Sequence, residues 1–188
     1  PQRTLATETI DLKTACGVLA EWDRRFNTDS RGAVLFREWL TRYPYNETHL
    51  GRELFALPFN PAKPLTTPAG LKDAAMALDK LAETVALMHR ARIPLDTPLG
   101  EHQRGHRMNK IFPVHGGNRR EGIANLQVST TRDSNPTETP VFTGSDTFMG
   151  DSESLSETGY NVVHGSSFIM TLAFTDEGPE AEAILSYS

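Results

Sequence analysis

The chain of 188 residues has the length of one ordinary domain, and its hydrophobic content of 38% is low for a globular protein. Its formal net charge of −5 argues against a general affinity for nucleic acid or for an anionic membrane surface. No apolar run approaches the roughly 20 residues that a membrane-spanning helix needs, and a single cysteine excludes an internal disulfide.

Apolar residues that recur at helical spacing predict three helices in residues 1–93. The first two place Trp22 and Trp39 on wide apolar faces, so we expect both indoles in the core rather than stacked on a ligand. Five prolines in residues 44–70 predict an extended connection between the second and third helices. The three helices are expected at about residues 11–24, 32–43 and 68 or 69 to 92.

Strand and turn signals dominate residues 94–188. Residues 108–114 predict an edge strand because they include Pro113, and residues 129–158 form a long polar loop. The nearly continuous apolar run at 168–174 is typical of a strand buried on both faces, with a return strand near 183–187. We therefore expect antiparallel strands after the helices, with a hairpin at the centre of a sheet, within a single α+β domain spanning residues 1–188.

Three histidines raise the question of a metal site. His102 and His106 would share one face of a helix, and His115 would add a third ligand. However, Pro94 and Pro98 precede the pair and no helix is predicted there, so the two imidazoles have no reason to converge. A metal-dependent hydrolase that uses these three histidines stays open as a weaker alternative.

Serine chemistry has little support within the chain. Ser166 and Ser167 follow His164-Gly165, but the Gly-x-Ser-x-Gly elbow is absent and both serines fall in a strand predicted to be buried. Considered without relatives, the residues predict an α+β fragment that lacks a self-sufficient active site. We therefore assign no catalytic residue, no metal ligand and no cofactor to this chain, and leave its substrate-binding residues unassigned.

The order of several segments resembles a known family. These are LAEWDRRFNTDSRGAVLFREWLTRY, FNPAKPLTTPAGL, PLGEHQ and VVHGSSFIMTLAFTDEGPEAEAILSYS. In this order they are similar to the C-terminal half of the large chain of penicillin acylases. Within that family, acyl-homoserine-lactone and aculeacin acylases are the nearest group. The resemblance covers nearly the whole chain, and residues 129–158 match least clearly.

The resemblance implies a fold and a mechanism. Members of the family are N-terminal-nucleophile hydrolases with a four-layered αββα sandwich. An exported precursor cuts itself into a small and a large chain, and the new N-terminal residue of the large chain attacks the amide. An asparagine side chain and a backbone N–H form the oxyanion hole. The nucleophile, the catalytic histidine and that asparagine all precede the matched region, and Pro1 carries no hydroxyl or thiol.

From this resemblance we expect the C-terminal structural part of an amidohydrolase. Its partners would be the remainder of the large chain, the small chain and an acylated substrate of the β-lactam, acyl-homoserine-lactone or lipopeptide type. The resemblance also implies an extracytoplasmic location and a role in antibiotic metabolism or quorum quenching. Because the chain opens without Met, we expect a processed or excised segment. A non-catalytic binding or regulatory module of the same fold is the main rival.

One position departs from the family pattern. Some cephalosporin-type relatives carry a glutamate that orients the catalytic histidine in the strand that matches residues 165–174. That position falls at Ala173 in this chain, so the resemblance leaves open how the histidine is oriented.

Overall fold

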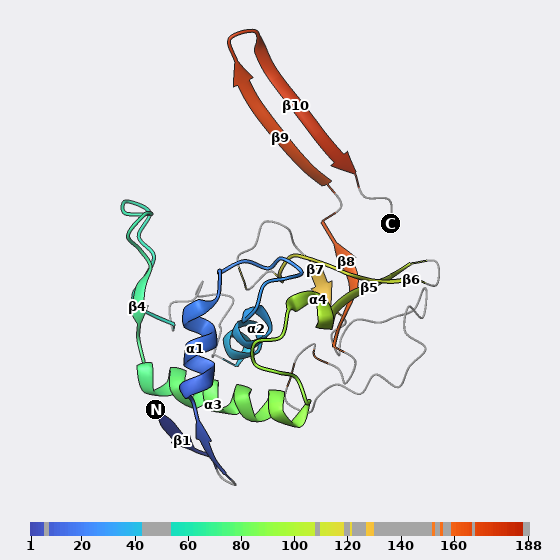
Figure 1. The fold of residues 1–188 in the computed structure, drawn as a ribbon. Coiled ribbons are helices and arrows are strands. Elements are labelled where there is room, and N and C mark those ends of the chain that lie inside the picture. Colours follow the sequence, from blue (N-terminus) through green and yellow to red (C-terminus); the bar gives the residue numbers. More distant parts are fainter. Residues whose placement is uncertain are drawn as a thin grey trace.

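The computed structural model describes residues 1–5, 8–42, 54–107, 110–118, 121, 127–129, 152, 155, 159–166 and 168–185. These residues combine helices with small sheets, which agrees with the predicted α+β class (Figure 1). Among the helices of this part of the chain, none is long and apolar enough to cross a membrane. The helices are α1 (Lys13–Glu21), α2 (Ala33–Thr41), α3 (Ala74–Arg90) and α4 (Leu99–His102).

The described strands form four separate sheets. Three of these sheets are antiparallel pairs: β1 (Gln2–Thr4) with β2 (Thr9–Asp11), β3 (Phe55–Leu57) with β4 (Ala69–Leu71), and β9 (Phe168–Thr175) with β10 (Gly178–Leu185). The fourth sheet has the order β6-β5-β8-β7, formed by β5 (Gln103–Arg107), β6 (Lys110–Pro113), β7 (Gln127–Ser129) and β8 (Tyr160–Gly165). As predicted, the segment with Pro113 lies at an edge of its sheet.

One pairing differs from the expected set of antiparallel strands. β5 and β8 run parallel, with Gln103 opposite Tyr160 and Gly105 opposite Val162. A parallel pair needs a crossover of a dozen or more residues, and the long stretch between β5 and β8 supplies it. This pairing makes β8 an inner strand, flanked by β5 and β7.

The core lies where the helices meet β2 and β8. Its buried members include Leu12, Leu35, Leu87, Leu99 and Tyr160. Both tryptophans pack against this core, as predicted: Trp22 stacks on Phe36 with ring centroids 4.7 Å apart. The Trp39 indole Nε1 donates a hydrogen bond of 2.8 Å to the carbonyl oxygen of Ala77, which ties α2 to α3.

The third helix starts later than predicted, at Ala74 rather than at residue 68 or 69. Its N-cap is Asp73, whose Oδ1 accepts a hydrogen bond of 2.9 Å from the Met76 backbone N–H. The residues before it pair as β4 with β3, and Gly70 there has a φ of +67°, which a helix does not allow. The sequence signal that would have found this start is the capping aspartate.

The largest correction concerns the hairpin β9–β10. The sequence predicts its first strand at the centre of a sheet, buried on both faces. Instead the hairpin is a sheet of two strands that extends away from the body (Figure 1), and every described side chain of β9 is exposed. Only the preceding segment fits the prediction, because Tyr160 and Asn161 on β8 are buried. An apolar run predicts that a strand is buried, but it does not identify the surface against which the strand packs.

Gly159 fixes the approach of β8 to α4 and β5. Its φ is +107°, and a Cβ at this position would collide with the backbone carbonyl oxygen of His102. We therefore expect Gly159→Ala to lower the free energy of unfolding by more than about 1 kcal/mol, measured by urea denaturation. The control is Gly17→Ala in α1, where a Cβ meets nothing within 4 Å. This substitution should raise the free energy of unfolding by up to about 1 kcal/mol. Equal effects of the two substitutions would contradict this assignment.

Candidate functional site: a buried ionic cluster

The most perturbed titratable groups of the described residues gather around Arg37 on α2. We call Arg37, Glu38, Arg42, Gln103, Glu121 and Tyr160 the ionic cluster. Arg37 binds Glu121 with two hydrogen bonds, Nε to Oε1 at 2.5 Å and Nη2 to Oε2 at 3.2 Å. Its Nη1 donates to the Gln103 side-chain oxygen at 2.6 Å. Both charged side chains of the Arg37–Glu121 pair are only 1% exposed, so this ion pair is fully desolvated.

Gln103 and Glu121 connect Arg37 to the sheet and to the turn after it. The Gln103 side-chain Nε2 donates to the carbonyl oxygens of Val114 and Gly116, at 2.8 and 2.9 Å. Glu121 Oε2 also accepts from the Asn118 backbone N–H at 2.7 Å. The bonds to the Glu121 carboxylate are charge-assisted and therefore strong, so the cluster holds Val114, Gly116, Asn118 and Glu121 against α2.

The other half of the ionic cluster joins α2 to β8. The Tyr160 hydroxyl donates a hydrogen bond of 2.7 Å to Glu38 Oε1. Arg42 Nη1 lies 3.7 Å from Glu38 Oε2, one helical turn along α2. The Arg37 guanidinium also lies over the Tyr160 ring, 4.5 Å from its centroid. Two arginines therefore face two glutamates, and the charges balance.

Burial shifts the pKa values of the cluster. Removal from water raises the pKa of the Glu38 carboxyl, although Tyr160 and Arg42 partly oppose the shift. Burial, with the neighbouring Glu38 carboxylate, raises the pKa of the Tyr160 hydroxyl well above its ordinary value. Burial lowers the pKa of Arg37, but Glu121, Tyr160 and Glu38 together outweigh this effect, and the net shift is upward.

Perturbed groups often mark active sites, yet here the geometry argues for a structural role. Arg37 and Glu38 are 1% exposed and Tyr160 is 0% exposed, so a substrate cannot reach the reactive atoms. The members of the cluster are also hydrogen-bonded to one another. Sequence reasoning missed this cluster. The available signal was an Arg-Glu pair in the middle of the otherwise apolar helix VLFREWL.

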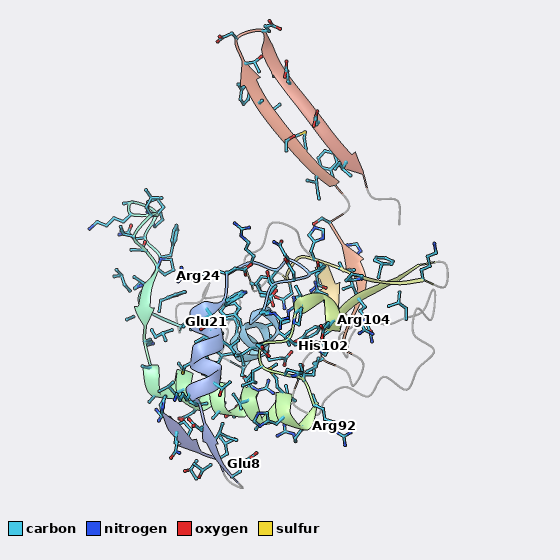
Figure 2. The ribbon with its side chains drawn as sticks, in the orientation of Figure 1. Glu8, Glu21, Arg24, Arg92, His102 and Arg104 are labelled. Atoms are coloured by element: carbon cyan, nitrogen blue, oxygen red, sulfur yellow. The ribbon has the colours of Figure 1, made fainter. Side chains whose placement is uncertain are left out.

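The histidines of the metal alternative have separate environments. His102 ends α4, a helix of four residues where the sequence predicts none, and its Nε2 lies 2.9 Å from the hydroxyl of Thr97. Burial lowers the pKa of His102; Glu101 opposes this shift, and Arg104 on the adjoining strand adds to it (Figure 2). His115 is exposed, and His106 lies on β5 with its side chain outside the described part. In the residues that the structure describes, no three His, Cys, Asp or Glu side chains group as metal ligands.

The remaining candidates lie near the base of the hairpin or on it. His164 is exposed near the end of β8, and Ser166 lies between β8 and β9 rather than inside a buried strand; Ser167 is outside the described residues. Ala173 lies on β9 directly opposite Glu180 of β10. Most of the predicted loop at 129–158 also lies outside the described residues, apart from Ser129, Ser152 and Leu155, which are buried.

Comparison with known proteins identifies the family. The described residues form a mixed α/β unit whose charged site is buried and structural. The sequence model of the penicillin amidase family matches residues 2–188, and the chain therefore belongs to this family.

The relatives include aculeacin-A acylase of Actinoplanes utahensis, 28% identical over 95% of this chain and 19% of the relative. Acyl-homoserine lactone acylase PvdQ of Pseudomonas putida is 27% identical over 95% of this chain and 20% of its own. PvdQ of Pseudomonas syringae pv. syringae is 24% identical over 98% of this chain and 21% of the relative. The chain thus spans about a fifth of the length of these curated relatives.

The Arg37–Glu121 pair should contribute strongly to stability. Glu121→Gln keeps the shape of the side chain but leaves the buried Arg37 charge without its counter-charge. We expect a loss of about 3–5 kcal/mol in the free energy of unfolding. The matched control is Glu83→Gln, which breaks the partly exposed Lys80–Glu83 pair and should cost less than about 1 kcal/mol. Urea denaturation compares the two, and similar losses would contradict a structural role for the cluster.

Tyr160 should make the free energy of unfolding depend on pH in the alkaline range. An unfolded tyrosine ionises near a pKa of about 10, while folded Tyr160 stays protonated to higher pH. Its contribution is therefore complete below about pH 10 and is lost as the pH rises through the folded pKa. Tyr160→Phe should cost about 1–3 kcal/mol at pH 7, because Glu38 loses its donor. This cost should shrink above about pH 10, and a cost that stays constant with pH would contradict the assignment.

Proposed function

We propose that this chain is a structural part of a penicillin-amidase-family acylase whose nucleophile lies outside these 188 residues. The larger enzyme would hydrolyse the amide bond of an acylated substrate through an acyl-enzyme. The present residues would supply strands and covering helices to an αββα sandwich. The observation that carries the proposal is the family match over residues 2–188 in a chain that spans only a fifth of its relatives.

The chemistry of the described residues supports a structural role for this chain and a nucleophile outside it. A nucleophilic mechanism needs a reactive group and a base within hydrogen-bonding reach, at a surface that substrate can approach. Among the described residues, the groups with strongly shifted pKa values are buried in the ionic cluster. Pro1 has no hydroxyl or thiol to attack with. The chemistry would then come from the rest of the enzyme, after autocatalytic cleavage of a precursor.

The surface also suits a part of a larger assembly. Among the described residues, large apolar side chains are exposed on β3 and β4 and the residues between them, on β6 and on the hairpin. Leu65 is 98% exposed between β3 and β4, Ile111 and Phe112 are exposed on β6, and Phe174 is 83% exposed on the hairpin. Burying one such side chain contributes about 1.5–3 kcal/mol, so several together favour a covering partner. That partner would be the remainder of the large chain and the small chain.

Substrate class follows from the relatives by name. Aculeacin-A acylase and acyl-homoserine lactone acylase act on acylated molecules, so an N-acyl-homoserine lactone and an acylated lipopeptide are the first substrates to test. A penicillin is the third, from the family name. On the resemblance alone we also propose an extracytoplasmic location, which fractionation of the source cells tests.

The test compares the complete gene product with the 188-residue chain on these three substrates. We expect the complete product to release the acyl group from at least one of them and the isolated chain to release it from none. Turnover by the isolated chain that is lost in His164→Ala or Ser166→Ala would overturn the proposal. Turnover lost with chelator and in His102→Ala or His115→Ala would instead favour the metal-dependent hydrolase.

A further inference from the structure

The hairpin β9–β10 has two unlike faces. Cross-strand partners lie on the same face and neighbours along a strand alternate, so the register sorts the side chains. One face carries Ile169, Thr171, Ala173, Glu180, Glu182 and Ile184, and is mixed in character. The other, which we call the apolar face, carries Phe168, Met170, Leu172, Phe174, Pro179, Ala181 and Ala183. The apolar face has no charged member, yet Phe168, Met170, Leu172 and Phe174 are 48–83% exposed.

The same register tells which backbone groups point outward. Thr175 and Gly178 close a two-residue loop, so they form a hydrogen-bonded pair, and bonded and non-bonded pairs then alternate along the ladder. The outward N–H and C=O groups of β9 therefore belong to Phe168, Met170, Leu172 and Phe174. On β10 they fall at Pro179, Ala181 and Ala183. The position of Pro179 agrees with this assignment, because proline has no N–H to donate to the ladder.

The two free edges are therefore not equivalent. β9 reads FIMTLAFT, with no charge and no proline along eight residues. β10 reads GPEAEAIL, with one proline and two glutamates. Proline and charged residues are the features by which proteins block the pairing of an edge strand. The β10 edge is protected by its sequence, and the β9 edge is not.

We propose that the free edge of β9 receives a further strand from the part of the same polypeptide outside these 188 residues. This inference rests on the proposed function. The incoming strand carries apolar residues at alternate positions, so that it extends the apolar face of the hairpin. A lone hairpin of two strands is at best marginally stable in water, which makes a third strand the expected cover. The family match includes the whole hairpin, so the hairpin belongs to the family fold rather than to an appendage.

Amide hydrogen exchange of the complete gene product tests this proposal directly. We expect the amides of Met170, Leu172 and Phe174 to exchange roughly 100-fold more slowly in the complete product than in the 188-residue chain. The outward amides of Ala181 and Ala183 should exchange quickly in both. Protection of Ala181 and Ala183 without Met170 and Leu172 would overturn the choice of edge, and no protection at either edge would overturn strand addition itself.

A pair of cross-strand partners offers a matched set of variants. Leu172→Pro removes an outward donor on β9 and Ala181→Pro removes its counterpart on β10, while neither touches the hydrogen bonds within the hairpin. Leu172→Ala measures the loss of the side chain alone. We expect Leu172→Pro to lower the melting temperature of the complete product more than Leu172→Ala or Ala181→Pro does. Equal effects of the two prolines would contradict an edge preference.

Three further results distinguish strand addition from self-association and from the proposed function. Protection of β9 in the 188-residue chain that grows with protein concentration would identify a second copy as the occupant and overturn the proposal. A complete product that hydrolyses acylated substrate with β9 unprotected would overturn this inference and leave the proposed function standing. Protection of β9 without hydrolysis would support strand addition and count against the proposed function.

Discussion

The desolvated ion pair between Arg37 and Glu121 is the interaction on which the described architecture depends. Arg37 lies on α2, but its partners are Gln103 on β5 and Glu121, which follows β6 in the sequence. Its neighbour Glu38 accepts from Tyr160 on β8. One turn of helix thus joins segments that are remote in sequence. Burying such charges is costly and is offset only when every partner is in place, so the cluster favours this one arrangement of helix and sheet.

The helices with their neighbouring sheet differ from the hairpin β9–β10 in how far their apolar residues are buried. The helical part of the described chain closes its own core, because α2 packs against both α1 and α3 and the inner strand β8 is flanked on both sides. The hairpin has an apolar face with no cover from the described residues and one edge without blocking residues. The chain spans about a fifth of the length of its curated relatives, and we propose that the rest of the enzyme covers the hairpin.

The sequence predicts local structure better than it predicts partners. Helical periodicity places α1, α2 and most of α3, because that signal lies within each segment. It misses the start of α3, which depends on the capping side chain of Asp73. It also misses the parallel pairing of β5 with β8 and the ionic cluster, since both join residues far apart in the chain. The apolar run of β9 predicts burial, but among the described residues no segment covers it.

We propose a supporting role for these residues, toward a catalytic group that they do not contain. Its most direct test is to trap the acyl-enzyme of the complete gene product with a reactive acyl ester and to map the labelled peptide. We expect a single label on the N-terminal residue of a processed large chain, upstream of Pro1. A label on any peptide within residues 1–188 would contradict it.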